Sequence, residues 1–167
     1  MKAMKAMVVY DSVYGNTAQI GEAIGAALGD ALGSPEHVQV VKAGDAKPEQ
    51  LAGVSLLVVG SATQKFSPLA ATSRFLKSIA KGGLNGVKVA AFDTRFPVSM
   101  IERIRILAFF VRIFGYAAEP IAKRLQRAGG ELVLPAQAFY VGDSEGSLLE
   151  GELEKAAEWG RQIVANL

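Results

Sequence analysis

Short apolar runs alternate along the chain with longer stretches in which apolar residues recur every three or four positions. The short runs predict strands, and the longer periodic stretches predict amphipathic helices. The first, third and fourth predicted strands are almost entirely apolar, which is typical of strands buried on both faces of a parallel sheet. The five predicted strands are 6–10, 37–41, 55–60, 87–92 and 131–134, and the last continues past Pro135 as 138–141.

Helical stretches fill the gaps between these strands. The predicted helices are 17–32, 69–80, 119–128 and 149–165, with a short piece near 48–51. Glycine pairs follow two of them, and glycine just after a helix is a common termination signal. Strands that alternate with crossover helices favour a parallel sheet. We therefore expect one α/β domain over residues 1–167, a three-layer α/β/α sandwich around a five-stranded parallel sheet.

One stretch is longer than this architecture needs. Residues 97–115 follow the fourth strand and are apolar almost all round a helix, interrupted mainly by Glu102, Arg103, Arg105 and Arg112. Such a helix must be buried by something, so we expect an apolar helical insertion after strand 4. Three interpretations of this insertion stay open. It packs on its own domain or closes over a ligand, or it forms a homodimer interface. In the third, it makes a peripheral contact with a membrane or a quinone-bearing partner.

Composition excludes several classes of site. The chain has no cysteine and a single histidine, His37, so thiolate chemistry, iron–sulfur clusters and multi-histidine metal sites are excluded. A net charge of +2 without a dense basic run does not indicate nucleic-acid binding. No apolar run is long enough for a transmembrane span and no secretory signal is recognisable, so we expect a cytoplasmic protein. No residue stands out as a catalytic acid, base or nucleophile, so redox chemistry would need a bound cofactor.

The loop after the first strand is the strongest candidate site. Its hydroxyls, an amide side chain and backbone N–H groups converge at the N-terminus of the first helix, which suits a phosphate. Gly15 allows the backbone to approach an anion closely. Taken alone, the loop is equally well explained as a capped helix start. The candidate residues are Ser12, Val13, Tyr14, Gly15, Asn16 and Thr17.

Two further loops are expected to meet this one. In an open α/β sheet, ligands bind beyond the carboxyl ends of the strands, where the strand order reverses. The loops after the third and fourth strands end there, and both combine small or polar residues with an aromatic that can stack on a flat ring. The aromatic residues of these loops could instead pack in the core. The acidic and basic residues Asp93 and Arg95 could instead form a local ion pair that shapes the loop. The candidates are Ala62, Thr63, Gln64, Lys65 and Phe66, then Asp93, Thr94, Arg95 and Phe96.

Several of these segments resemble the flavodoxin family. Residues 8–17 are similar to its phosphate loop, Gly-Ser-Ala-Thr at 60–63 is similar to its second flavin loop, and 142–153 with Trp159-Gly160 resembles its last loop and helix. The chain departs from the family pattern at Val13, Gly21 and Ala62, and neither Trp nor Tyr stands at the usual ring-stacking positions. The resemblance covers nearly the whole chain apart from 97–115 and implies the strand order 2-1-3-4-5.

The resemblance implies FMN as the cofactor. The phosphate would lie in the loop 12–17, and the loops 62–66 and 93–96 would border the isoalloxazine ring. The implied function is an FMN-binding redox protein, either an electron carrier or a small flavin-dependent oxidoreductase, working with a partner protein, a quinone or NAD(P)H. The alternatives are a quinone-linked oxidase similar to flavodoxin-like protoporphyrinogen oxidases and a flavin-free binding module. Positive charge at Lys65 and Arg95 would favour the reduced, anionic flavin and hence two-electron chemistry.

Overall fold

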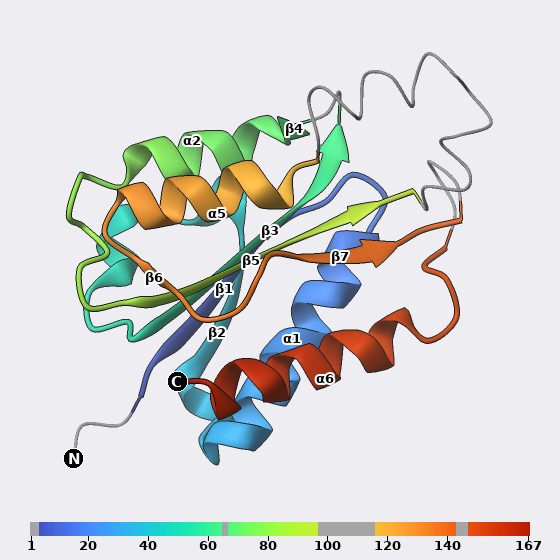
Figure 1. Cartoon of the computed structure of the whole chain (residues 1–167), viewed down its shortest axis with the longest axis horizontal. Coiled ribbons are helices and arrows are strands. Elements are labelled where there is room, and N and C mark those ends of the chain that lie inside the picture. Colours follow the sequence, from blue (N-terminus) through green and yellow to red (C-terminus); the bar gives the residue numbers. More distant parts are fainter. Residues whose placement is uncertain (1–3, 65–66, 97–115, 143–146) are drawn as a thin grey trace.

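A parallel sheet forms the centre of the molecule, seen in a computed structural model that describes residues 4–64, 67–96, 116–142 and 147–167 (Figure 1). The sheet runs β2-β1-β3-β5-β6, and β7 also pairs with β5 in parallel. Because β6 and β7 are successive parts of the fifth strand, the predicted order 2-1-3-4-5 is confirmed. The strands are β1 (Ala6–Asp11), β2 (Val38–Lys42), β3 (Leu56–Gln64), β4 (Ser67–Pro68), which pairs antiparallel with β3, β5 (Lys88–Arg95), β6 (Glu131–Leu132) and β7 (Gln137–Tyr140).

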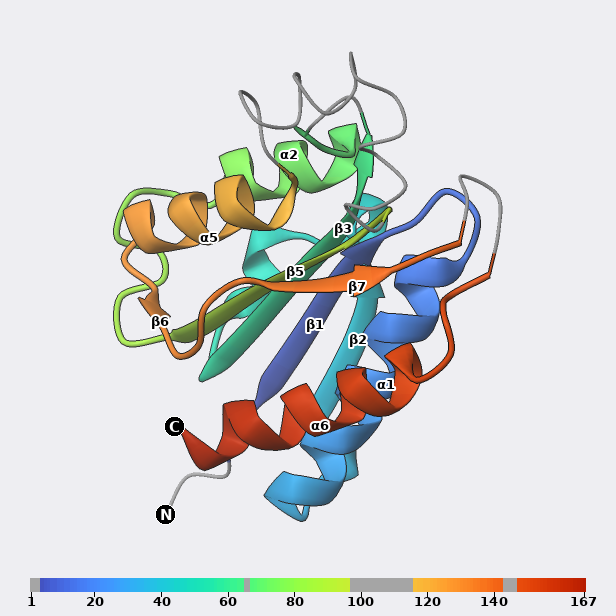
Figure 2. The same cartoon turned by 45° about the vertical axis from the view of Figure 1, so that its right-hand side comes forward.

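Among the described residues, two pairs of helices cover the two faces of this sheet (Figure 2). Helices α1 (Asn16–Leu32) and α6 (Glu152–Ala165) lie on one face, and α2 (Ala70–Ser78) and α5 (Ala118–Arg127) lie on the other. The 3-10 helices η1 (Pro35–His37), η2 (Ala43–Asp45) and η3 (Pro48–Leu51) flank β2 and precede β3. The predicted three-layer α/β/α sandwich is therefore confirmed, with helix ends within a few residues of those expected.

Alternation along β5 shows how the sheet supplies both cores. Val89 and Ala91 pack beneath α2 and α5, whereas Ala90 and Phe92 pack beneath α1 and α6. The Phe92 ring meets Phe139 and Trp159 edge to face, with ring centroids 6.0 and 6.1 Å apart. A Cβ atom at Gly60 on the neighbouring strand would lie 2.1 Å from the Phe92 ring, so a glycine at that position is what gives the ring its place.

The fifth strand is interrupted where the sequence contains a proline. The Val133 N–H still bonds to the Val89 carbonyl oxygen, but regular pairing resumes only at Gln137, opposite Phe92. Proline has no N–H to donate to a sheet ladder, so Pro135 explains the break between β6 and β7. The expected continuation past Pro135 is present, as two short strands in place of one. The predicted insertion 97–115 lies outside the described residues.

Candidate functional site

Three central strands end side by side at one edge of the sheet. Asp11 at the end of β1 is level with Ser61 on β3, and Ser61 is level with Asp93 on β5. The loops that follow these strands therefore start from one edge, as the sequence predicts. The loop from Ser12 to Gly15 leads from this edge directly into α1.

The first loop is a polar turn that ends at an uncharged helix start. Gly15 has a φ of +93°, a left-handed conformation that L side chains rarely adopt, and its N–H donates to the Ser12 hydroxyl at 3.0 Å. No acidic residue lies in the first turn of α1. The first N–H groups of a helix have no acceptor inside that helix and carry its positive end. This combination of donors without negative charge suits an anion.

Two residues of this loop point outward, and one is buried. Val13 and Tyr14 are 51% and 57% exposed, so neither belongs to the core. Thr17 is buried, and its hydroxyl lies 2.8 Å from the hydroxyl of Thr94 on β5. The Thr17–Thr94 hydroxyl pair therefore joins the start of α1 to the end of β5. This contact brings together two residues that were predicted from different loops.

The loop after β3 is held by backbone-directed hydroxyls. The Ser61 hydroxyl donates to the Ala62 carbonyl oxygen at 2.8 Å and accepts the Leu69 N–H at 2.9 Å. The Thr63 hydroxyl accepts the Ala117 N–H at 3.1 Å, just before α5 begins. Thr63 therefore stabilises the start of a helix that is 54 positions away in the sequence. Gln64 is the last residue of β3, and Lys65 and Phe66 lie outside the described residues.

Asp93 and Arg95 form an ion pair on the opposite side of β5 from Thr94. The Arg95 guanidinium donates to both carboxylate oxygens of Asp93, through Nε at 2.6 Å and through Nη2. The Ala118 N–H donates to the same carboxylate at 2.9 Å, and the guanidinium lies 3.7 Å from the centre of the Tyr116 ring. We call Asp93, Arg95, Tyr116 and Ala118 the charged clasp. The local ion pair considered for Asp93 and Arg95 is thus present.

Burial governs the electrostatics of the charged clasp. Asp93 is fully buried, and this burial raises the pKa of its carboxyl above the usual 3.8, although Arg95 and the Ala118 N–H both act to lower it. Burial also raises the pKa of the Tyr116 hydroxyl. The Arg95 charge is offset at close range by Asp93, so it acts on a neighbouring anion more weakly than a free cation would. Arg95 is thus a weaker source of positive charge than its sequence position suggests.

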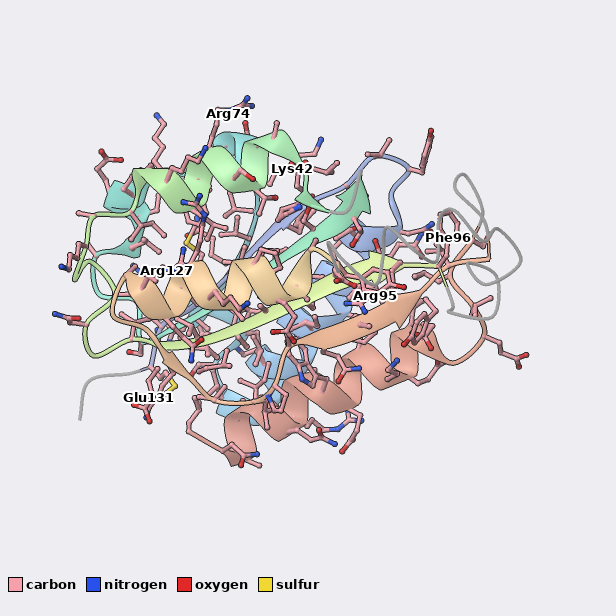
Figure 3. All side chains as sticks on the ribbon, turned by 45° about the horizontal axis from the view of Figure 1, so that its top comes forward. Lys42, Arg74, Arg95, Phe96, Arg127 and Glu131 are labelled. Carbon is pink, nitrogen blue, oxygen red and sulfur yellow. The ribbon has the colours of Figure 1, made fainter. Side chains whose placement is uncertain are left out.

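Sequence reasoning missed one side chain of this edge. The Asp-x-Arg spacing on a strand places Asp93 and Arg95 on the same face, which was a sufficient signal for their pairing. Tyr116 follows the long stretch 97–115, and nothing in its sequence context marks it as the residue that stacks on Arg95. Phe96, half-buried, follows Arg95 at the end of β5 (Figure 3).

Within 4–64, 67–96, 116–142 and 147–167, no three His, Cys, Asp or Glu side chains gather in a way that would hold a metal ion. Over the same ranges, no helix is both long enough and apolar enough to cross a bilayer.

The chain is similar to solved structures of flavodoxins. No protein-family model matches the sequence, and no curated protein matches it. Among solved structures, a flavodoxin from the domain Archaea superposes with a TM-score of 0.71 at 23% identity, with 97% of each chain covered. Flavodoxin 1 from Bacillus cereus gives a TM-score of 0.73 at 16% identity, with 98% of this chain and 99% of that chain covered.

A larger protein contains the same unit. The flavodiiron protein from Giardia intestinalis matches with a TM-score of 0.71 at 14% identity, over 97% of this chain and 36% of that chain. This chain therefore spans about a third of the flavodiiron chain and nearly all of each flavodoxin. Strand order, layer arrangement and these superpositions agree, and the chain has the flavodoxin-like fold.

Proposed function

We propose that this chain is an FMN-binding redox protein that holds the FMN phosphate in the loop 12–17. The observation that carries the proposal is the start of α1, where a left-handed glycine and a hydroxyl-rich turn meet a helix end without a carboxylate. This feature lies at the sheet edge where β1, β3 and β5 end together. In open α/β sheets that edge is where ligands bind.

The donor chemistry of the loop fits a phosphate. The Ser12 and Thr17 hydroxyls, the Asn16 amide and the first N–H groups of α1 are neutral donors at the positive end of a helix. Gly15 keeps its left-handed turn with open space beside it, since nothing lies within 4 Å of where a Cβ would stand. When bound, FMN would supply reversible electron transfer, and the protein would bind, orient and shield it.

The ring end of the site is proposed at the loops 62–66 and 93–96. The polar side chains of Thr63, Asp93 and Arg95 are already bonded within the protein. Contacts to the ring would therefore come mainly from backbone groups and from aromatic side chains such as Phe96. Because these residues hold one another in place, the ring would meet a preorganised surface.

Electron carriage fits this site better than acid–base catalysis. Of the charged side chains at this edge, Asp93 and Arg95 are engaged with one another and with the start of α5. The flavodoxins and flavodiiron proteins that share the fold support a redox role. A partner protein is proposed as the exchange partner, and quinone or NAD(P)H use and a cytoplasmic location stay predictions.

The phosphate site can be tested with a variant that spares the fold. Asn16→Asp adds one negative charge to the first turn of α1, where the helix dipole stabilises it. The same charge would repel a phosphate held there. We expect unchanged or slightly higher thermal stability together with FMN binding weakened about tenfold or more, equivalent to about 1.4 kcal/mol. Quenching of FMN fluorescence measures the affinity, and riboflavin, which lacks the phosphate, serves as a second ligand.

The matched control is Gln19→Glu, an exposed position one turn further along α1. It makes the same change in charge farther from the helix end, so FMN affinity should stay within about twofold of wild type. Wild-type protein should bind FMN much more tightly than riboflavin. Equal affinity for the two ligands, or equal weakening by both variants, would refute a phosphate site in this loop.

A further inference from the structure

The outer faces of α2 and α5 form a surface of almost one sign. Figure 3 shows Arg74 on α2 and Arg127 on α5, on the same side of the sheet. Between them, the two helices and the turn after α2 carry six exposed cations and a single carboxylate, that of Glu119. We call this surface the basic face. Its cations are Arg74, Lys77, Lys81, Lys123, Arg124 and Arg127.

The opposite helical layer has the reverse net charge, and its few cations are paired within it. Helices α1 and α6 carry five carboxylates, those of Glu22, Asp30, Glu152, Glu154 and Glu158, against two cations. Both of these cations are paired within α6, Lys155 with Glu152 and Arg161 with Glu158. By contrast, no cation of the basic face forms an ion pair with any of the described residues. Over these four described helices, the charge is therefore negative on one face of the sheet and positive, without internal ion pairs, on the other.

Helix stability does not account for the whole basic face. Lys77, Arg124 and Arg127 lie in the last turns of their helices, where the dipole favours cations. Arg74 and Lys123 lie in mid-helix and gain little from it. Several cations are also spaced three or four positions apart, as in Arg74–Lys77 and Lys123–Arg127, a spacing at which like charges destabilise a helix.

The chemistry of the basic face indicates what it binds. Large exposed hydrophobic side chains of the described residues lie elsewhere, at positions 13, 14, 40, 149, 153 and 167. Helices that lie on membranes combine cations with an apolar face, and single-stranded nucleic acid is bound with stacking aromatics. Among the described residues, neither feature accompanies these cations. A charged surface without apolar anchors is suited to a reversible encounter with an acidic protein, in which electrostatic attraction raises the association rate.

The two helices of the basic face begin at the proposed flavin edge, and its cations lie in their middle and last turns or just after them. Helix α5 starts at Ala118, whose N–H bonds to Asp93 at the end of β5. Helix α2 has nine residues, so it is about 14 Å long. A protein interface of ordinary size buries about 800 Å² on each partner, enough to span both helices and reach the edge where they begin.

We propose that the basic face is the docking surface for an acidic redox protein. The redox character of the partner rests on the proposed flavin function, whereas its acidic character rests on the charges of α2 and α5 alone. Docking there places the partner beside the loops that end β3 and β5.

The test uses the FMN-loaded, nitrogen-15-labelled protein and an acidic two-iron ferredoxin as the probe. At low salt, amide signals of α2 and α5 should shift on titration, and the shifts should vanish at high salt because exposed charges are then screened. The triple variant R74Q/K123Q/R127Q should bind the probe about tenfold more weakly or worse. The control K5Q/K88Q/R161Q removes the same net charge elsewhere and should stay within about twofold.

Parallel measurements separate this proposal from its alternatives. Thermal melting and FMN affinity of R74Q/K123Q/R127Q should match wild type, so weaker probe binding cannot come from misfolding or flavin loss. The control breaks the surface ion pairs Lys88–Glu131 and Arg161–Glu158 and should lose only a little stability. Phosphatidylserine vesicles, a short DNA duplex and a second copy of the chain are tested on the same face. Three results would overturn the docking proposal. The control variant could lose as much probe binding as R74Q/K123Q/R127Q, or the shifts could map outside α2 and α5. The vesicles, the DNA or a second copy of the chain could also bind this face more tightly than the ferredoxin does. If the protein bound the ferredoxin in a salt-dependent way but did not bind FMN, only the proposed function would be refuted.

Discussion

The end of β5 carries two contrasting arrangements on its two sides. Toward α1, Thr94 meets Thr17 through neutral hydroxyls 2.8 Å apart. Toward α5, Asp93 and Arg95 form a bidentate ion pair that also holds the first N–H of that helix. Successive residues of one strand thus supply a neutral side, next to the proposed phosphate loop, and a charged side, next to a helix start.

The difference shows which side is available to a ligand. In the charged clasp, each charge already has its partner, and burying such groups is tolerable only because they are paired. The hydroxyl pair has no net charge and spare hydrogen-bonding capacity, since each hydroxyl has one donor and two acceptor sites. We therefore expect changes to the charged clasp to act mainly on stability, and changes on the neutral side to act mainly on FMN affinity.

The largest effect is expected from Arg95→Gln. This change leaves the fully buried Asp93 carboxylate without its counter-charge, and breaking a buried pair in this way costs about 3 kcal/mol of unfolding free energy near neutral pH. Burial already raises the Asp93 pKa, so the folded protein holds that proton more tightly than the unfolded chain. The contribution of Asp93 to stability therefore falls as pH rises from about 4 through its folded pKa.

Without Arg95, the Asp93 pKa rises further and this loss extends to higher pH. Urea unfolding at several pH values should show a deficit relative to wild type that grows as pH rises. Arg95→Lys keeps the charge but loses the bidentate geometry and the stacking on Tyr116, so its deficit should be smaller and less dependent on pH. A deficit for Arg95→Gln that is the same at acidic and neutral pH would contradict this assignment of the charged clasp.

Local patterns in the sequence predicted the strands, the helices and the three layers, whereas the strand order was predicted from the resemblance to flavodoxins. Apolar runs such as 56–60 indicated the strands directly, and Gly129, with positive φ, follows the end of α5, whereas α2 already ends at Ser78, before Gly82. Pro135 marked an irregularity in the predicted fifth strand, but the sequence did not predict that the strand is divided into β6 and β7. These features depend on residues that are close together in the sequence, and such local patterns largely determine secondary structure and strand burial.

The contacts that connect distant segments could not be predicted in this way. Thr63 accepts an N–H from Ala117, and Asp93 accepts one from Ala118, across 54 and 25 positions. Both residues were predicted at the flavin, which stays a prediction, and both also bond to the start of α5. A hydroxyl or carboxylate at a strand end serves a ligand or a helix equally well, and only the position of α5 decides between them. The Asp93–Arg95 pair was foreseeable because its partners are two residues apart on one strand.

A smaller effect is expected from Gly15→Ala on the neutral side. The left-handed backbone at φ +93° should cost about 1–2 kcal/mol with alanine, while the open space there means no clash. Gly33→Ala is the matched control, because Gly33 ends the same helix with φ +70° and also has open space. Both variants should lose similar stability in thermal melts, but only Gly15→Ala should weaken FMN binding. Equal FMN affinity of the two would show that the turn at Gly15 serves the helix alone.

The smallest effect on stability is expected where both hydroxyls are removed. Thr94→Val leaves the buried Thr17 hydroxyl without its partner and should cost about 1 kcal/mol. The double variant T17V/T94V replaces both polar groups with similar apolar shapes, so most of that loss should be recovered. If Thr17 also serves the phosphate, the double variant should melt close to wild type and yet bind FMN more weakly. Wild-type FMN affinity in the double variant would mean that the neutral side, like the charged clasp, serves only to hold α1 and β5 together.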